Sequence, residues 1–444
     1  GAYPIVTDYC EFILYEEEKM LKSRERLSLA LNHQEPDRVP LDLGGTPVTG
    51  MHASSVYTLR QALKLDPPGT PVKVIDPYQI SGEIKPDLIE ALGVDVVGVA
   101  PPRNFFGFKN EGWREWQLSD GTPVLVPALF NIDPEPDGSI YQYPEGDRSV
   151  PPSGRMPKDG FYVDAIIRQP PIDEANLNPE DNLEEFKPIS AADLDYFARE
   201  IERLYTQTDK AIVANFGGTA FGDISLVPAT WLKQPKGIRD VEEWYISTLT
   251  RPDYIYQVFE RQAEIALANL ARLHQVIGER IAVIYVTGAD FGTQQAPFLS
   301  EKAYRELFLP FHKKICDWVH ANTTWKTFMH SDGAIMPLLP SMAEAGIDIL
   351  NPIQWTARNM DPQTLKDRFG DRFVFWGGGV DTQGTLPFGT PAQIQEEVNR
   401  NIHIFGRGGG YVFSTVHNVQ PGVPAENLLA LYQTVQAGRT YPLA

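Results

Sequence analysis

The chain has 444 residues, enough for one large barrel with insertions or for two ordinary domains. Its 58 acidic and 39 basic side chains give a net charge of -19, which repels nucleic-acid phosphates and anionic membrane surfaces. No apolar run approaches the roughly 20 residues needed to span a bilayer. We therefore expect neither a nucleic-acid nor a membrane partner.

The cysteines and the first residues indicate the cellular setting. Cys10 and Cys316 are the two cysteines, and neither lies in a CxxC pair. Residues 1–19 lack the basic start and long apolar run of a secretory signal, and their three consecutive glutamates oppose organelle targeting. These features predict a cytoplasmic protein, with residues 1–19 as an extension to one domain over 20–444.

Short apolar runs alternate with helical patterns along the chain, an order typical of parallel strands joined by helices. Strands are predicted over residues 38–43, 94–99, 211–216, 281–286, 325–330, 347–351, 373–376 and 411–415. Helices are predicted over residues 52–63, 253–278, 301–321, 336–345, 392–404 and 425–436. Eight strands in this order predict an α/β fold, a single (β/α)8 TIM barrel.

One region interrupts the alternation, between the second and third predicted strands. Residues 101–188, approximately, are rich in proline and glycine, and contain Trp113, Trp116 and the turn sequence SDGTP at 119–123. Such turn signals indicate a β-rich insertion built from hairpins. We expect it to form a lid or wall over the barrel.

Barrel enzymes place their reactive groups at the C-terminal ends of the strands. His330 and Asp332 follow the fifth predicted strand, and His417 follows the eighth. Two imidazoles and a carboxylate form a ligand set that Zn²⁺ or Fe²⁺ accepts. Strand-end histidines that only hydrogen-bond a loop carbonyl are the alternative. The pattern predicts a metal site at these three residues, with Asp332 and His417 also as catalytic candidates.

Further candidates follow other strands. Asp290 directly follows the fourth strand and is either a general base or a cap for the next helix. His52 follows a glycine-rich segment and either faces the mouth or starts a helix. The glycines at 377–379 predict a tight turn that allows close approach of a substrate. The other predicted substrate contacts are Gln294, Trp355, Asp381 and Gln383. Aromatic residues of the insertion, with Trp355, wall an apolar pocket in this interpretation or else pack in the core.

Several phrases of the sequence together resemble the uroporphyrinogen decarboxylase superfamily. They lie at residues 23–31, 36–40, 288–294, 330–333, 376–383 and 417–427. The likeness runs from about Met20 to the C-terminus. It implies a (β/α)8 barrel and two possible branches, the true uroporphyrinogen decarboxylases and the cobalamin-linked methyltransferases that use zinc.

The resemblance is closer to the methyltransferase branch. True decarboxylases carry an arginine-rich segment near the N-terminus for substrate carboxylates, whereas residues 43–47 here contain no arginine. The zinc set of the methyltransferases, an HxC pair and a late ligand, matches His330, Asp332 and His417. Asp332 stands where the cysteine is usual, which leaves the identity of the metal open, since both zinc and ferrous iron accept such a set.

The resemblance therefore implies an enzyme that passes a methyl group from a small O-, N- or S-methyl substrate to a corrinoid protein. The sequence has no DxHxxG cobalamin-binding motif, so the cobalamin is expected on a separate partner. By analogy with related barrels we expect a homodimer. The alternatives are a cobalamin-independent decarboxylase or lyase, with Asp290 or Asp332 as acid or base, and a non-catalytic member of the superfamily.

Overall fold

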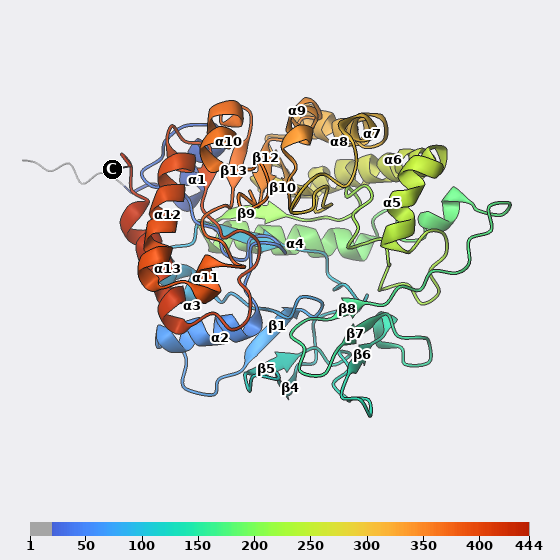
Figure 1. Ribbon diagram of the computed structural model, residues 1–444, viewed down its shortest axis with the longest axis horizontal. Coiled ribbons are helices and arrows are strands. Elements are labelled where there is room, and N and C mark those ends of the chain that lie inside the picture. The colour runs from blue at the N-terminus through green and yellow to red at the C-terminus, as the bar shows by residue number, and fades with distance from the viewer. Residues whose placement is uncertain (1–19, 444) are drawn as a thin grey trace, which may run out of the picture.

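The computed structural model describes residues 20–443, and its centre is a curved sheet of seven parallel strands (Figure 1). The strands are β3 (Val96–Val99), β9 (Ala211–Ala214), β10 (Val283–Thr287), β11 (Lys326–His330), β12 (Ile349–Asn351), β13 (Val374–Trp376) and β14 (Tyr411–Val412). Each pairs with its neighbours in chain order, from β3 at one edge to β14 at the other. All seven overlap strands predicted from the sequence.

Residues 40–42 close the sheet between β14 and β3. The N–H of Phe413 donates to the carbonyl of Pro40 at 2.8 Å, the N–H of Asp42 to Phe413 at 2.9 Å, and the N–H of Asp95 to Leu41 at 2.8 Å. The N–H of Leu41 instead donates to the Asp95 carboxylate at 3.0 Å, which interrupts the ladder. The first predicted strand is thus reduced to a bridge, and the predicted barrel fold is confirmed.

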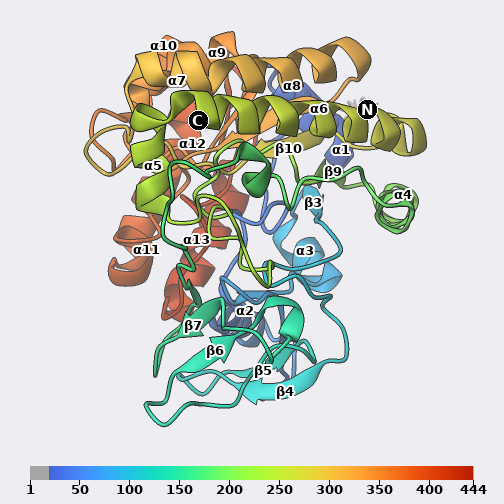
Figure 2. The same ribbon diagram turned by 90° about the vertical axis from the view of Figure 1, so that its right-hand side faces the viewer.

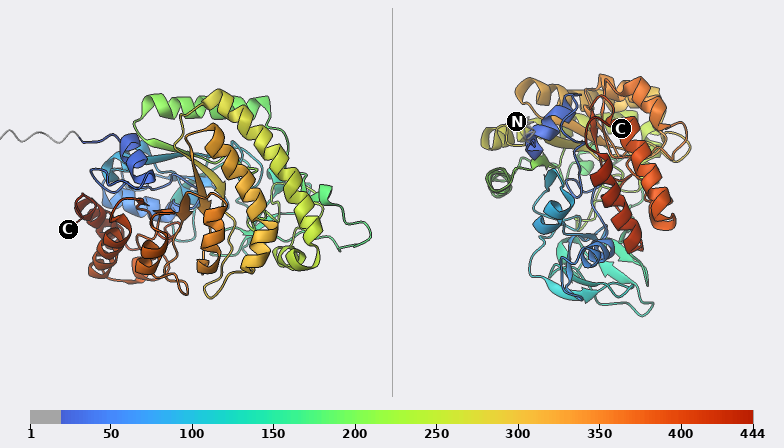
Figure 3. Two further views of the ribbon diagram at one scale, coloured as in Figure 1. Left: turned by 90° about the horizontal axis from the view of Figure 1, so that it is seen from above. Right: turned by 90° about the vertical axis from the view of Figure 1, so that its left-hand side faces the viewer.

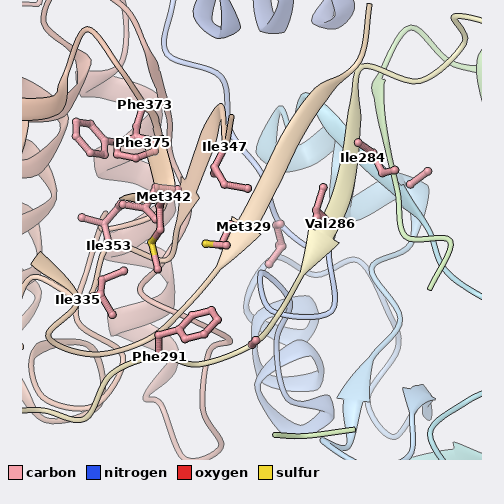
Figure 4. Packing of buried hydrophobic residues seen from close by; sticks show 14 of the residues in the cluster. Ile284, Val286, Phe291, Met329, Ile335, Met342, Ile347, Ile353, Phe373 and Phe375 are labelled. Atoms are coloured by element: carbon pink, nitrogen blue, oxygen red, sulfur yellow. The ribbon is translucent and has the colours of Figure 1, made fainter. Parts of the chain in front are cut away.

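The barrel has one apolar cluster inside and a larger one outside. The interior is filled by inward-facing side chains of all seven strands, among them Val96, Val213, Tyr285, Phe328 and Trp376. The larger cluster includes strand side chains of the opposite face, such as Val286 and Met329, together with residues of the surrounding helices (Figure 4). Burial of both strand faces explains why the strands read as continuous apolar runs rather than as alternating patterns.

Helices surround the strands (Figure 3). Those that overlap predicted helices are α2 (Ala53–Ala62), α6 (Pro252–Ile277), α7 (Glu301–Leu307), α8 (Leu309–Asn322), α9 (Leu339–Glu344), α12 (Pro391–Gly406) and α13 (Ala425–Gly438). The single helix predicted over 301–321 divides at Phe308, because Pro310 lacks the N–H that would continue the helical ladder. None of the helices within residues 20–443 combines the length and apolarity needed to cross a membrane.

Six helices were not among the sequence predictions: α1 (Ser23–Leu31), α3 (Pro86–Leu92), α4 (Ala191–Gln207), α5 (Val241–Thr250), α10 (Pro362–Phe369) and α11 (Thr385–Phe388). The chain also forms single 3-10 turns, η1 (Pro144–Gly146), η2 (Pro179–Asn182) and η3 (Met336–Leu338). The helix predicted over 336–345 therefore starts with η3 before α9.

The segment between β3 and β9 contains β4 (Arg114–Gln117), β5 (Pro123–Val126), β6 (Ile140–Gln142), β7 (Gly154–Met156) and β8 (Asp164–Ala165). Strands β6, β7 and β8 form one small sheet. Strands β4 and β5 join β1 (Val72–Asp76) and β2 (Ser81–Gly82), which precede β3, in a second. Both sheets lie together beyond one side of the barrel (Figures 1 and 2).

Candidate functional site

The structure brings the three predicted metal ligands together at the C-terminal ends of the strands. One ligand atom each from His330, Asp332 and His417 lies within 4.8 Å of the others. The Asp332 Oδ2 atom is 3.7 Å from His330 Nε2 and 3.9 Å from His417 Nε2. His330 is the last residue of β11, Asp332 follows it, and His417 lies five residues beyond β14.

Asn351 holds the His330 ring. The two residues are register partners at the ends of adjacent strands, so their side chains emerge at the same level. The Asn351 amide donates through Nδ2 to the carbonyl of Trp376 at 2.7 Å, which leaves Oδ1 facing His330 Nδ1 at 2.6 Å. Nδ1 must therefore carry the proton and donate, and in the neutral imidazole Nε2 keeps the lone pair that a metal needs.

The His417 ring is held in the opposite tautomer to that of His330. Its backbone φ is 66°, in the left-handed region, and its Nδ1 accepts the N–H of Asn418 at 2.7 Å. The neutral ring therefore carries its proton on Nε2, the atom that faces Asp332. The Asn418 side chain anchors this loop, because its Oδ1 accepts the N–H of Gly50 at 2.6 Å. His417 is thus presented as a proton donor, and ligation through Nε2 requires release of the Asn418 contact.

Asp290 completes the cluster from the end of β10. Its Oδ1 accepts the backbone N–H of Asp332 at 2.8 Å and lies 3.7 Å from His330 Nε2. Burial raises the pKa of Asp290 to about 6, with a further contribution from Asp332 against the opposing effect of His330. Asp290 therefore fixes the loop that carries Asp332 and is also a titratable group within reach of the same imidazole.

The two histidines differ in charge. Burial alone would lower the pKa of His330, but Asp332 and Asp290 raise it to about 9. Burial lowers the pKa of His417 to about 4, although Asp332 opposes the shift. His330 and His417 hold the pKa of Asp332 below its usual value, against the effect of burial. At neutral pH the metal-free cluster therefore holds its proton on His330.

Two groups at the site were not identified from the sequence, Asp223 and Tyr285. Asp223 lies nine residues beyond β9, is 7% exposed, and accepts hydrogen bonds from the N–H and the hydroxyl of Ser225. Its Oδ2 and the Tyr285 hydroxyl both approach Gly288, at 3.3 and 2.4 Å from the place that a side-chain Cβ would take. Only a glycine fits between them, but nothing in a single sequence distinguishes Gly288 from an ordinary loop glycine.

His52 lies at the start of α2, and both of its ring nitrogens already have hydrogen-bond partners. It caps α2 by accepting the N–H of Ser54, and its Nε2 contacts the carbonyl of Phe161 at 3.0 Å. Burial lowers its pKa to about 4. The ring thus joins α2 to the 101–188 region, and the helix-start alternative describes its observed contacts.

The remaining predicted substrate contacts also have local roles. The exposed Gln294 contributes its backbone carbonyl to the N–H of Arg358. Trp355 donates from Nε1 to Gly378 and lies under the guanidinium of Arg400. Asp381 accepts the N–H of Gln383, whose side chain is exposed. None of these side chains hydrogen-bonds the His330 cluster, and their roles toward a substrate stay predictions.

His330 and Asp332 are placed to bind a divalent metal as they stand. His417 can join them only if its Nδ1 releases the N–H of Asn418. Zinc ligands at about 2.0–2.1 Å lie roughly 3.4 Å apart in a tetrahedron, so separations of 3.7 and 3.9 Å need only small adjustments. The Asn351 contact presets Nε2 of His330 for ligation. A group of two imidazoles and two nearby carboxylates can thus bind a metal or transfer a proton.

The closed parallel sheet and the polar cluster at its C-terminal end define a (β/α)8 barrel with its candidate site at the usual place for that fold. The chain belongs to the uroporphyrinogen decarboxylase (URO-D) family, whose model matches residues 161–438. The superfamily predicted from the sequence is thereby confirmed.

Individual relatives are distant. The chain is 26% identical over 207 residues to the uroporphyrinogen decarboxylase of Shewanella denitrificans, covering 43% of this chain and 56% of the relative. The enzyme of Pseudomonas fluorescens is 24% identical over 217 residues, with 47% and 55% covered. The chain spans about half the length of these curated relatives. A methyltransferase from Methanosarcina mazei shares the fold, with a TM-score of 0.51 and 14% identity over 94% of this chain and 99% of that one.

Proposed function

We propose that this protein is a metal-assisted methyltransferase that moves a methyl group from a small O-, N- or S-methyl substrate to the cobalamin of a separate corrinoid protein. The convergence of His330, Asp332 and His417 within 4.8 Å supports this proposal most directly. A zinc or other divalent ion held by these residues would act as a Lewis acid on the heteroatom that carries or receives the methyl group.

The protein's own groups prepare this site in three ways. Asn351 fixes the tautomer and orientation of His330. The Asp290 carboxylate holds the Asp332 loop by accepting the backbone N–H of Asp332. Gly333, whose φ is 89°, packs against the backbone of Gly292, so that the loops after β10 and β11 run in direct contact. Such support keeps ligands in place before a substrate arrives.

The charge of the site speaks against uroporphyrinogen as the substrate. Among residues 20–443, Asp290 and Asp332 form ion pairs only with histidines, and neither pairs with a lysine or arginine. A polycarboxylate substrate would meet two carboxylates that no lysine or arginine neutralises. The chain's family membership is therefore compatible with an activity other than porphyrinogen decarboxylation.

The test is transfer to free cob(I)alamin. The zinc-loaded protein is incubated with a panel of aryl ethers, methylamines and methyl thioethers, and methylcobalamin is followed by its absorbance. We expect at least one donor to react, and Asp332→Ala to abolish the reaction, while Glu396→Gln on the exposed face of α12 leaves it unchanged. Failure of the whole panel would count against methyl transfer.

The proton-transfer groups of the cluster favour a second candidate function, a cobalamin-independent decarboxylase or lyase. His417 presents an N–H to Asp332, and Asp290 has a pKa of about 6, so the cluster holds a donor and an acceptor of protons without a metal. This candidate predicts activity that survives exhaustive chelation. Loss of activity on chelation, and recovery with zinc, would exclude it.

A further inference from the structure

We propose that the substrate of this site is a small monocation, an ammonium or sulfonium compound, which binds against Asp223, Asp290 and the phenol of Tyr285. This inference deepens the proposed function and rests on it in one respect, because the His330 cluster is taken as the reacting centre. The binding step itself does not depend on which group is transferred.

The charge balance of the site favours a cationic substrate. Three carboxylates, Asp223, Asp290 and Asp332, surround His330, and none of them forms an ion pair with a lysine or arginine among residues 20–443. With a divalent metal and neutral imidazoles, three carboxylates leave a local charge of about -1. One positive charge on the substrate balances this remainder, whereas a neutral or anionic substrate does not.

The Tyr285 hydroxyl lies beside Asp223. Tyr285 is 7% exposed and its ring stacks on Phe328 inside the barrel, with centroids 5.3 Å apart. Its hydroxyl points to the level of Gly288, beside Asp223 Oδ2, and makes no hydrogen bond with any other residue that the structure describes. The phenol oxygen is therefore open to a ligand or to water. Its oxygen can accept polarised C–H groups of a methylated cation.

The Asp223 carboxylate supports the same conclusion. Ser225 satisfies Oδ1 twice, at 2.9 and 2.6 Å, but no side chain within residues 20–443 donates to Oδ2. Burial raises the pKa of Asp223, against the lowering effects of Ser225, His330 and the Gly288 backbone. A cation placed beside Oδ2 would stabilise the ionised carboxylate further.

An aromatic pair, Tyr245 and Phe298, lies next to the Asp290 backbone. The Tyr245 hydroxyl donates to the backbone carbonyl of Asp290 at 2.8 Å, and its ring stacks on Phe298 at 4.9 Å. Phe298 is 43% exposed, so this stacked pair reaches the surface. Rings of this kind attract ammonium and sulfonium groups more strongly than neutral groups of the same shape.

Calorimetric titration with choline and with its neutral carbon isostere, 3,3-dimethylbutan-1-ol, tests the inference at pH 8 on metal-loaded and metal-free protein. The two probes have the same shape and differ in charge. We expect choline to bind at least about fivefold more tightly, because unlike charges about 4 Å apart contribute roughly that much even at the dielectric constant of water. Asp223→Asn should reduce choline affinity about three- to tenfold and leave the isostere unchanged.

Glu396→Gln makes the same change of charge on the exposed face of α12 and should alter neither affinity. Tyr285→Phe, which keeps the ring and removes the hydroxyl, should weaken choline selectively and provides a second variant if Asp223→Asn does not fold. Equal binding of the two probes by the wild-type protein overturns the inference, as does equal weakening of both by Tyr285→Phe. The titration needs neither cobalamin nor methyl transfer, so its outcome is separate from that of the proposed function.

Discussion

Replacement of Asn351 by leucine tests whether the orientation of His330 prepares a metal site. Asn351 is fully buried, and leucine has a similar volume, so the main change is the loss of two hydrogen bonds. The His330 Nδ1–H and the Trp376 carbonyl lose their partners, and each unsatisfied buried group costs about 1–3 kcal/mol. We expect the free energy of unfolding to fall by about 2–6 kcal/mol.

Zinc affinity should fall about 10- to 100-fold, or about 1.4–2.8 kcal/mol, because the ring no longer has a fixed tautomer and orientation. The matched control is Asn401→Leu. Asn401 is equally buried and donates to the carbonyls of Gly378 and Gly379, but it does not contact a histidine. Competition with a chromophoric chelator measures zinc affinity, and urea unfolding measures stability. Wild-type zinc affinity in Asn351→Leu, or an equal loss in Asn401→Leu, would show that Asn351 does not prepare His330 for the metal.

Three further results are expected. The pKa of metal-free His330 is about 9, so zinc binding at pH 7.5 should release about one proton. Calorimetry in buffers of different ionisation heat measures this release. For the same reason, zinc affinity should rise about tenfold per pH unit and level off above pH 9. Gly333→Ala should lower both zinc affinity and thermal stability, since a Cβ would lie 2.4 Å from the Gly292 backbone. Trp376→Phe removes the 2.8 Å hydrogen bond to Asp42, so the pKa of that carboxyl, raised by burial to about 6, should rise further in carboxyl NMR titrations.

Each of these results has a contrary outcome. No proton release at pH 7.5 would mean that His330 is neutral before the metal arrives. A Gly333→Ala protein with unchanged zinc affinity would show that close contact of the two loops is not needed for the site. An unchanged Asp42 pKa in Trp376→Phe would show that the indole does not stabilise the ionised carboxylate.

The sequence predicted the barrel well because its strands are buried on both faces. Runs such as 281–286 and 373–376 are continuously apolar, and the structure places β10 and β13 there. The first strand was less predictable, since its interruption depends on Asp95, a residue more than 50 positions away that captures the N–H of Leu41. The pairing of β1 with β5 likewise joins segments on either side of β3, and no local pattern encodes such a pairing.

The site was predicted in part for the same reason. Strand ends are visible in the sequence, so His330, Asp332, Asp290 and His417 could be singled out, and the structure places them in one cluster. The residues that support them could not be singled out from the sequence. Asn351, for example, becomes important only because it is the register partner of His330. Gln294, Trp355, Asp381 and Gln383 also follow strands, but position along a strand does not determine which way a loop side chain points. Their observed contacts are with local backbone and helix groups.

Metal content shows whether His330, Asp332 and His417 form a metal site. The protein is purified without chelators, loaded with zinc, dialysed and submitted to elemental analysis beside Asp332→Ala and the surface control Glu396→Gln. We expect about one tightly bound divalent metal per chain in the wild type and the control, and its loss in Asp332→Ala. Absence of stoichiometric metal from all three proteins, or its full retention in Asp332→Ala, would contradict a metal site at these residues.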